Sequence, residues 1–317
     1  MPDLYRGRTE GITGATLEGM TDRPPSRSRR PNPLSGAGLD RLSHVRADAA
    51  ALAARLEDLE TVAVPVWRGK VATSGAPPRL HTAVVADLED RAWLLGEAGG
   101  TTYVAVEVGD DDLDGLDLPD EVRWAGLMEV GANLEPLHAH LGATATALAT
   151  WHRTHRFCGT CGAETVADWA GFRRRCESCG REHFPRTDPA VIMRVTHGER
   201  ILLARNPGWP QGFGSVLAGF VEPGESLEDA VSREVKEEVG LSVADVEYHS
   251  SQPWPFPASV MLGFTVEATS DVIVVDPAEV AEAGWYTREE VRDGILALPP
   301  TVSIARHLID DWLDGHH

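Results

Sequence analysis

The sequence predicts an α/β protein made of an α+β N-terminal domain, a short metal-binding segment and a C-terminal α/β domain. Three observations lead to this prediction. Short runs of β-type residues alternate with helical periodicity from about residue 37 onward. All four cysteines lie between residues 158 and 179. The length of 317 residues and the apolar fraction of 42% suit about two domains with real hydrophobic cores.

Charge and cysteine content limit the class of protein. The chain has 49 Asp+Glu against 29 Lys+Arg, a net charge of −20, which argues against a broad basic surface for nucleic acid. No run approaches the ~18 apolar residues of a membrane span, and the first residues lack the apolar segment of a secretory signal. Four clustered cysteines are too few for a disulfide scaffold. We therefore expect a soluble cytoplasmic protein.

Residues 1–36 are predicted to form a disordered tail. They contain RPPSRSRRPNP and almost no apolar periodicity. A basic tail can also contact nucleic acid, but six arginines against four acids favour a plain extension.

The next part, residues 37–150, is predicted to be the α+β domain, with no evident catalytic cluster. Helical periodicity covers 39–56 and 137–157, where Leu137, Leu141, Leu148 and Trp151 share one face. Between these helices lie the β-type runs 61–67, 81–88 and 101–108.

An acidic stretch in this domain has the spacing of a calcium loop. Asp110, Asp112, Asp114 and Glu121 fit the pattern, with Gly115 at its glycine position. A β-type run precedes the stretch where a helix is required, and Asp117 occupies a position that is usually aliphatic. A solvated acidic turn is the better interpretation of residues 110–121, and whether it binds any cation stays open.

Residues 151–187 are predicted to bind zinc. Cys158 and Cys161 form one C-x2-C pair, Cys176 and Cys179 form another, and fourteen residues separate the pairs. Four thiolates in two close pairs can complete a tetrahedral, closed structural site. A glycine follows each pair, at a turn that needs backbone freedom. Disulfides or a redox pair are the rival interpretations.

The last part, residues 188–317, contains a helix rich in glutamate. Ser226 and Asp229 mark its start and Gly240 its end. Glu234, Glu237 and Glu238 overlap the edge of the apolar stripe instead of lying opposite it. The bland alternative is a solvated face, but like charges at this spacing beside a core repel one another unless a cation joins them. We predict a site for Mg²⁺ or Mn²⁺.

The segment from Gly219 to Leu241 resembles the Nudix box, G-x5-E-x7-R-E-U-x-E-E-x-G-U, at every defined position. The resemblance implies an α/β/α sandwich with a mixed sheet, and hydrolysis of a nucleoside diphosphate linked to another group. It also implies that the box glutamates hold the metal and that Glu225 and Arg233 chiefly stabilise the loop–helix–loop. Gly219 and Gly240 are the structural glycines of the box.

A segment rich in proline and aromatic residues follows at 251–259, SQPWPFPAS. Prolines at alternate positions restrict φ and favour an extended, stiff conformation. From the residues alone, a substrate-binding wall and a structural loop are equally good interpretations, and a proline-recognition ligand is a third.

This segment, placed after a Nudix box, resembles the NADH pyrophosphatases of the NudC type. That family has a four-cysteine zinc ribbon directly before the Nudix domain and a separate, Nudix-like N-terminal domain. The resemblance implies that Ala218, Glu234, Glu237, Glu238 and Glu279 contact the catalytic metal and that the glutamates include the catalytic groups. Glu238 is our candidate for activating or orienting water, and the sequence leaves open which of Glu234, Glu237 and Glu238 is the base. It also implies the following substrate-binding residues: Phe184, Phe220, Gln252, Pro253, Trp254, Pro255, Phe256, Pro257, Ala258, Ser259 and Ala305.

The function implied is hydrolysis of NADH or NAD⁺ to nicotinamide mononucleotide and AMP, and removal of NAD caps from RNA 5′ ends. Phe184 stands where some members have Tyr, which keeps stacking but loses a hydroxyl. In the family that aromatic comes from the neighbouring subunit, which implies a homodimer. A broader hydrolase of ADP-ribose or dinucleoside polyphosphates and a non-catalytic zinc-ribbon RNA-binding protein are the alternatives.

Overall fold

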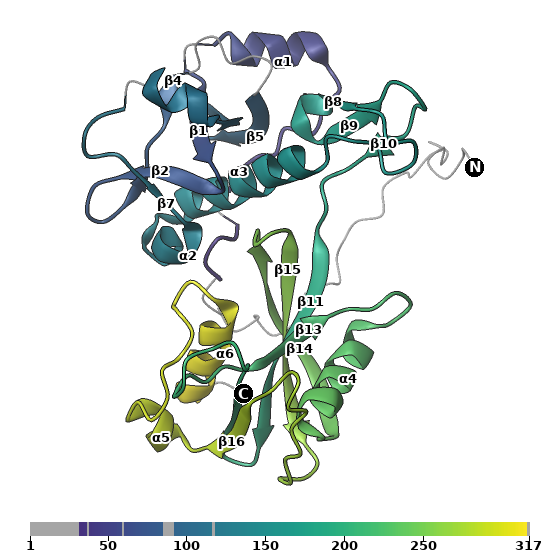
Figure 1. Cartoon of the computed structure of the whole chain (residues 1–317). Helices are drawn as coiled ribbons and strands as arrows, with labels where there is room; N and C mark the ends of the chain where they lie inside the picture. Colours follow the sequence, from purple (N-terminus) through teal and green to yellow (C-terminus); the bar gives the residue numbers. More distant parts are fainter. Residues whose placement is uncertain (1–31, 37, 59, 85–91, 116–117, 316–317) are drawn as a thin grey trace, which may run out of the picture. The chain divides into compact units, whose positions relative to one another are not determined.

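The computed structural model describes residues 32–36, 38–58, 60–84, 92–115 and 118–315 (Figure 1). Most of the predicted tail (residues 1–31), part of the predicted β run (85–88) and Asp117 lie outside these residues. None of the described helices has the length and apolar character of a membrane span.

The first described residues differ from the predicted tail. Leu34 is buried in the core of the N-terminal domain, and the Asn32 side chain donates hydrogen bonds to Ser250 Oγ and the Ser251 carbonyl, both at 2.9 Å. A short apolar segment with one amide therefore packs against the folded chain, although its sequence has no periodicity.

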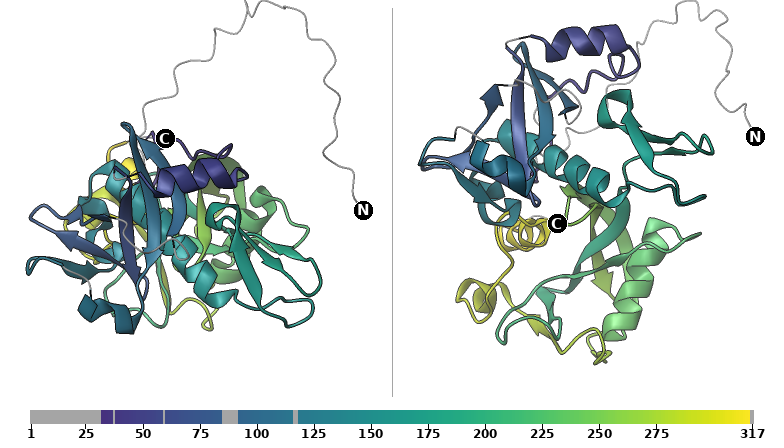
Figure 2. Two further views of the ribbon diagram at one scale, coloured as in Figure 1. Left: turned by 90° about the horizontal axis from the view of Figure 1, so that it is seen from above. Right: turned by 45° about the horizontal axis from the view of Figure 1, so that its top comes forward.

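The N-terminal domain is a seven-stranded mixed sheet with a long helix against it (Figures 1 and 2). Strands β1 and β6 pair in parallel, and the other pairs are antiparallel. The strands are β1 (Val62–Trp67), β2 (Lys70–Ser74), β3 (Arg79–Leu80), β4 (Ala83–Val84), β5 (Ala92–Ala98), β6 (Thr101–Glu107) and β7 (Arg123–Ala125). The helices are α1 (Ala49–Leu56), α2 (Leu127–Val130) and α3 (Pro136–Thr154), with 3₁₀ turns η2 (Asp110–Gly115) and η3 (Gly131–Asn133). Helix α3 contributes Leu141 and Leu148 to the main core.

The first helix is shorter than its periodicity predicts. It starts at Ala49 because the Asp48 side chain accepts hydrogen bonds from the N–H groups of Ala50 and Ala51 and so caps the helix. Leu42, inside the predicted helix, has a left-handed φ of 47°. Apolar residues at helical spacing therefore begin before the hydrogen-bonded helix does.

The acidic stretch begins with a carboxylate that already has partners. Asp110 accepts hydrogen bonds from Arg68 at 2.6 Å and from Trp67 Nε1 at 2.8 Å. Residues 110–115 form η2.

The cysteine segment is a small antiparallel sheet of β8 (Thr165–Asp168), β9 (Arg173–Cys176) and β10 (Glu182–His183), with the 3₁₀ turn η4 (Trp169–Gly171) between the first two strands. His152 at the end of α3 is buried against it, stacks on Trp93 and hydrogen-bonds the Gly171 carbonyl at 2.9 Å. His152 is thus a packing residue between the long helix and the cysteine segment.

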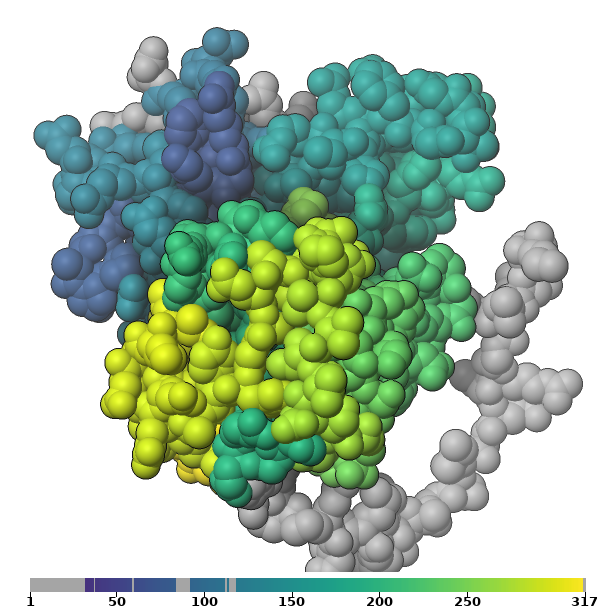
Figure 3. Space-filling model, turned by 60° about the horizontal axis from the view of Figure 1, so that its bottom comes forward, coloured from purple at the N-terminus to yellow at the C-terminus, as the bar shows by residue number. Residues whose placement is uncertain are grey.

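The C-terminal domain is a six-stranded mixed sheet between helices. Its strands are β11 (Asp188–His197), β12 (Arg200–Arg205), β13 (Leu217–Phe220), β14 (Val243–Trp254), β15 (Ser259–Ala268) and β16 (Glu282–Tyr286). Only β11 and β15 pair in parallel. One core packs α4 (Leu227–Val239) on one face, and a second packs α6 (Ile304–Leu313) and α5 (Arg288–Arg292) on the other. In Figure 3 the α4 region (green) and the C-terminal helices (yellow) lie on opposite sides of the yellow-green segment that includes β16. The predicted α/β/α sandwich is confirmed.

Candidate active site and metal centres

Helix α4 has the limits and the buried face that its sequence predicts. The Ser226 hydroxyl accepts from the Asp229 N–H at 3.1 Å, and Gly240 ends the helix with a left-handed φ of 73°. Val231, Val235 and Val239 are fully buried. Glu234 lies on the same face of the helix, against the sheet, and its side chain is only 8% exposed.

Three carboxylates meet beside α4. Oxygen atoms of Glu234, Glu238 and Glu279 all lie within 4.8 Å of one another. The loop that carries Glu279 is held at the end of the helix, because the Asp276 N–H donates to the Glu238 carbonyl at 3.0 Å and the Val274 N–H donates to the Val239 carbonyl at 3.0 Å. Of the four predicted metal-binding glutamates, the structure therefore brings together all but Glu237.

Glu237 is exposed and lies outside this carboxylate cluster. Its carboxylate accepts a hydrogen bond from Arg233 at 3.0 Å. The predicted backbone ligand, Ala218, is an exposed residue of β13 opposite Ile192 in β11.

The surroundings of Glu234 and Glu238 disfavour the ionised form of their carboxyl groups. Burial raises the pKa of Glu238 to about 8, and the nearby carboxylates of Glu234 and Glu279 add to this effect. Burial also raises the pKa of Glu234. A divalent cation would remove the repulsion and stabilise the ionised carboxylates. The donor set consists of carboxylate oxygens, which suits Mg²⁺ or Mn²⁺.

Arg233 connects the loop before the helix to the helix itself. Its guanidinium donates to both oxygens of Glu225, at 2.7 and 2.9 Å, and to the Phe220 carbonyl at 2.9 Å. It also donates to Glu234 at 2.9 Å. The Arg233 hydrogen bonds hold the pKa of Glu225 below its usual range, so this pair stays ionised. These are the contacts that a stabilising role for Glu225 and Arg233 requires.

Gly219 lies directly under the Glu234 carboxylate. A Cβ built on Gly219 would come within 1.9 Å of the Glu234 Cδ and Oε1 atoms, which is far inside any real contact distance. Only glycine therefore lets strand β13 approach the buried carboxylate this closely.

We expect Gly219→Ala to displace Glu234 and to lower metal affinity and kcat at least about tenfold. Gly126→Ala is the matched control, because the added Cβ there meets nothing within 4 Å and the residue has no left-handed φ. Metal titration by calorimetry and steady-state kinetics would measure both effects. Unchanged metal affinity in Gly219→Ala would show that the Glu234 position does not matter.

The segment 251–259 forms the end of a hairpin instead of an extended wall. Strand β14 runs to Trp254, residues 255–258 turn, and β15 begins at Ser259, which pairs with Trp254. Trp254 and Phe256 contact each other edge to face at 5.0 Å. Phe256 packs against the core of the N-terminal domain.

Two residues of the predicted substrate set point inward. Gln252 is fully buried, and its amide donates to the carbonyls of Pro33 and Val302 while its Oε1 accepts from the Ile304 N–H at 2.8 Å. Ala305, in the first turn of α6, is buried in the core under that helix. Gln252 is predicted to bind substrate, but in the structure the donors and the acceptor of its amide are used within the chain.

The two predicted stacking aromatics are open to solvent. Phe220 is 62% exposed and Phe184 is 52% exposed. Large aromatic side chains with this exposure are available to a ligand or to another protein surface.

The four cysteines form one cluster. Cys158 Sγ lies 3.7 Å from Cys179 Sγ, and Cys161 Sγ lies 3.5 Å from Cys176 Sγ. Tetrahedral zinc with Zn–S bonds of ~2.3 Å requires sulfurs ~3.8 Å apart, so the spacing fits zinc and not a disulfide. A hydrogen bond from the Thr160 N–H lowers the pKa of the Cys158 thiol to about 5, which favours the thiolate ligand.

The two knuckles have matching backbones. Gly162 and Gly180 have φ of 76° and 73°, and their N–H groups donate to the carbonyls of Cys158 and Cys176, both at 2.8 Å. His183 Nε2 lies 3.4 Å from Cys158 Sγ, a contact that sequence reasoning missed because no pattern connects these residues.

Sequence reasoning also missed a cluster on the α6 face. His249 on β14 hydrogen-bonds Asp311 on α6 at 2.8 Å, and His307 lies beside them. The pair is 62 residues apart in sequence, and only the packing of α6 on the sheet brings it together.

Three family models match successive parts of the chain. The NADH pyrophosphatase-like rudimentary NUDIX domain matches residues 60–151, the NADH pyrophosphatase zinc ribbon domain matches 153–184, and the NUDIX domain matches 185–312. The zinc ribbon and its four clustered cysteines fit a structural Zn²⁺.

The chain is also similar to curated proteins over most of its length. It is 38% identical over 298 residues to the NAD-capped RNA hydrolase NudC of Mycobacterium bovis, covering 88% of this chain and 94% of that protein. It is 44% identical over 201 residues to the protein of the same name from Stutzerimonas stutzeri, covering 62% of this chain and 71% of the other. The identity extends over the N-terminal domain, the ribbon and the Nudix domain in the first of these relatives, and the chain therefore belongs to the NudC family of Nudix hydrolases.

Proposed function

We propose that the protein hydrolyses the diphosphate of NADH and NAD⁺, giving nicotinamide mononucleotide and AMP. The cluster of Glu234, Glu238 and Glu279 supports this most directly, because three carboxylates this close together, two of them with a pKa raised by burial, favour a bound cation. A bound Mg²⁺ or Mn²⁺ would neutralise the diphosphate and lower the pKa of water.

The residues of the chain have distinct parts in this proposal. Glu234, Glu238 and Glu279 would hold the metal with the backbone of Ala218, and Glu237 would join them by leaving Arg233. Glu238 would orient or deprotonate the attacking water, because a pKa raised to about 8 lets its carboxyl group accept and release a proton near neutral pH. Arg233 and Glu225 would keep the loop in place.

Water would add to one phosphorus of the diphosphate, and the bridging oxygen would leave with the other phosphate. A proton from the water would pass to Glu238 or to solvent. Phe220 would stack on the nicotinamide, since its ring is exposed at the end of β13, one residue after Gly219 begins the box. The hairpin residues Trp254 to Ser259 would form a further wall for the substrate.

The same bond cleavage would remove an NAD cap from RNA. The relatives named NAD-capped RNA hydrolase support this extension, including NUDT12 of Macaca fascicularis, which is 42% identical over 197 residues, 57% of this chain and 43% of that protein. An RNA 5′ end needs only a local site, so the net charge of −20 does not oppose it.

A homodimer and a cytoplasmic location complete the proposal. The exposed Phe184 would reach the Phe220 site of a second copy, because two exposed aromatics can sandwich a flat ring. A reducing cytoplasm keeps zinc-binding thiolates available. Light scattering tests the dimer: a monomer at concentrations that give full turnover would contradict it.

The decisive experiment incubates the protein with NADH and either Mg²⁺ or Mn²⁺ and identifies the products. We expect AMP and reduced nicotinamide mononucleotide in equal amounts, and no products without divalent metal. Equal turnover of ADP-ribose would instead support a broader hydrolase. Binding of capped RNA with no metal-dependent cleavage would support an RNA-binding protein.

A further inference from the structure

A second cluster of metal-binding side chains lies where α6 packs on the C-terminal sheet, on the face opposite α4. His249 of β14 and His307 and Asp311 of α6 each offer a ligand atom, and these atoms all lie within 4.8 Å of one another. Two imidazoles and a carboxylate form a donor set that suits Zn²⁺, whereas Mg²⁺ prefers oxygen alone. None of these three side chains is a predicted ligand of the catalytic metal.

The position of His249 results from an irregularity in β14. The residues on either side of it, Tyr248 and Ser250, pair with consecutive residues of β15, so His249 is an extra residue on its strand. Bulges of this kind change the direction in which a side chain points. The His249 side chain is only 2% exposed, whereas the neighbouring Tyr248 is open to solvent.

The ring of His249 has a partner at each nitrogen. Nε2 lies 2.8 Å from Asp311 Oδ2, and Nδ1 lies 2.8 Å from Ser250 Oγ. The Ser250 hydroxyl in turn accepts from the Asn32 amide at 2.9 Å. A metal-binding histidine typically donates its second N–H to a fixed acceptor of this kind, which orients the ring. When Nδ1 donates to Ser250, the lone pair of Nε2 can bind a metal beside Asp311.

His307 is the member of the cluster that an ordinary ion pair does not explain. It precedes Asp311 by four residues, so both side chains lie on one face of α6. Its ring lies edge to face with that of His249, with the centroids 5.7 Å apart. Its Nε2 is buried and has no hydrogen-bond partner among the described residues. A buried nitrogen without a partner is unfavourable, and a cation shared with His249 and Asp311 would relieve this.

We propose that His249, His307 and Asp311 form a second zinc site, in addition to that of the ribbon. Tetrahedral Zn²⁺ with bonds of ~2.0–2.1 Å needs ligand atoms ~3.3 Å apart. The cluster, with its ligand atoms no more than 4.8 Å apart, reaches this spacing by adjustment of the side chains. Zn²⁺ takes the place of the proton in the His249–Asp311 hydrogen bond, which is released to solvent. The bound ion would join α6 to β14 and stabilise the C-terminal domain.

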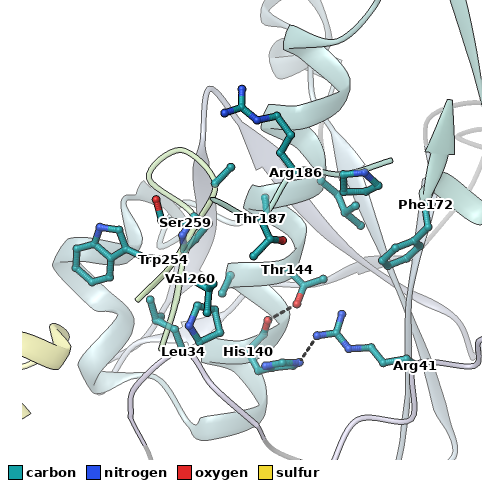
Figure 4. A pocket seen from close by; sticks show the side chains of 17 residues that line it. Leu34, Arg41, His140, Thr144, Phe172, Arg186, Thr187, Trp254, Ser259 and Val260 are labelled. Atoms are coloured by element: carbon teal, nitrogen blue, oxygen red, sulfur yellow. Dashed lines mark hydrogen bonds between the residues drawn. The ribbon is translucent and has the colours of Figure 1, made fainter. Parts of the chain in front are cut away.

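The cluster is separate from the proposed substrate site. A cavity of about 290 Å³ beside the β14–β15 hairpin is lined by residues of the proposed substrate wall, including Trp254 and Ser259 (Figure 4). His249, His307 and Asp311 are not among the described residues that line it. Zinc binding at the cluster therefore does not depend on hydrolysis of NADH.

The test is calorimetric titration of the full-length chain with Zn²⁺, with the ribbon already loaded with zinc and with Mg²⁺ in excess to occupy the glutamate cluster. We expect one further Zn²⁺ to bind per chain. His307→Phe should lower the affinity for this ion at least about tenfold, because it removes a ligand and keeps an aromatic ring. The variant should fold as stably as the native chain without added zinc, because it removes a buried nitrogen that has no partner among the described residues.

His138→Phe is the matched control. His138 is also a half-buried helical histidine with a buried ring nitrogen that has no partner among the described residues, but it belongs to none of the metal-binding clusters found there. It should bind the further Zn²⁺ as the native chain does. Added Zn²⁺ should raise the unfolding temperature of the native chain and of His138→Phe, but not that of His307→Phe.

Asp311→Asn is a second variant, which keeps the size of the side chain and removes its charge. It should also lower the affinity for the further Zn²⁺ at least about tenfold. No uptake of zinc beyond that of the ribbon by the native chain would overturn the proposal, and so would native zinc affinity in His307→Phe. We expect His307→Phe to hydrolyse NADH at the native rate with Mg²⁺, so a failure of this site and a failure of the proposed hydrolysis give different results.

Discussion

Glu238→Gln is expected to lower kcat for NADH hydrolysis by about two to four orders of magnitude, the range for loss of a general base or a metal-binding carboxylate. The change keeps the size of a partly buried side chain, so the helix should fold as before. It removes the negative charge that would hold the metal and accept the proton. Product analysis with saturating Mn²⁺ measures the effect.

Glu228→Gln is the matched control, because Glu228 is an exposed glutamate in the first turn of the same helix. It should retain native kcat. Native turnover in Glu238→Gln would eliminate Glu238 from the mechanism. Circular dichroism of both variants would separate a loss of chemistry from a loss of folding.

The raised pKa of Glu238 adds a pH dependence to metal binding. Below its pKa of about 8 the cluster holds a proton that the metal must displace, so metal affinity should rise as pH increases toward 8. The dependence should weaken in Glu238→Gln, which has no such proton. Mn²⁺ titrations from pH 6 to pH 8 measure it, and an affinity that falls over this range would contradict the carboxylate site.

Cys176→Ser is expected to release the structural zinc and unfold the ribbon. Cys176 is fully buried, and its sulfur lies 3.5 Å from that of Cys161. Three remaining thiolates cannot close a tetrahedral site, and folding of small zinc domains depends on the metal. We expect zinc content to fall from about one ion per chain to nearly none, and limited proteolysis to cut between residues 158 and 183.

Ser178→Ala, within the same knuckle, should keep its zinc and its resistance to proteolysis. One firmly bound zinc in Cys176→Ser would mean that the cysteines are not the ligands. Chelation of the native protein should reproduce the proteolysis seen in the variant.

Local sequence patterns determined the limits of one helix and the form of the zinc knuckles. The limits of α4 follow from Ser226 and Gly240, whose effects act within one turn of the chain. The zinc knuckles follow from the C-x2-C spacing, which is a local constraint as well. The first helix shows the limit of such patterns, because the cap at Asp48 starts it at Ala49, ten residues after its apolar periodicity begins at Leu39.

The candidate site could be predicted in part only. Helical phase indicated that Glu234 and Glu238 share an edge of α4, but not that Glu237 would turn to Arg233. The inward position of Gln252 was also unpredictable, because the buried carbonyls it binds belong to Pro33 and Val302, far away in sequence.

The sequence by itself predicted three successive domains and the metal-binding residue types, and it determined the Nudix motif, since all of these depend on neighbours along the chain. Only the tertiary structure decided that Glu279 joins the α4 carboxylates, that Gly219 makes room for Glu234, and that His249 meets Asp311. The physical reason is that charge repulsion, desolvation and close packing depend on distances in space. Segments far apart in sequence set those distances when the cores are packed.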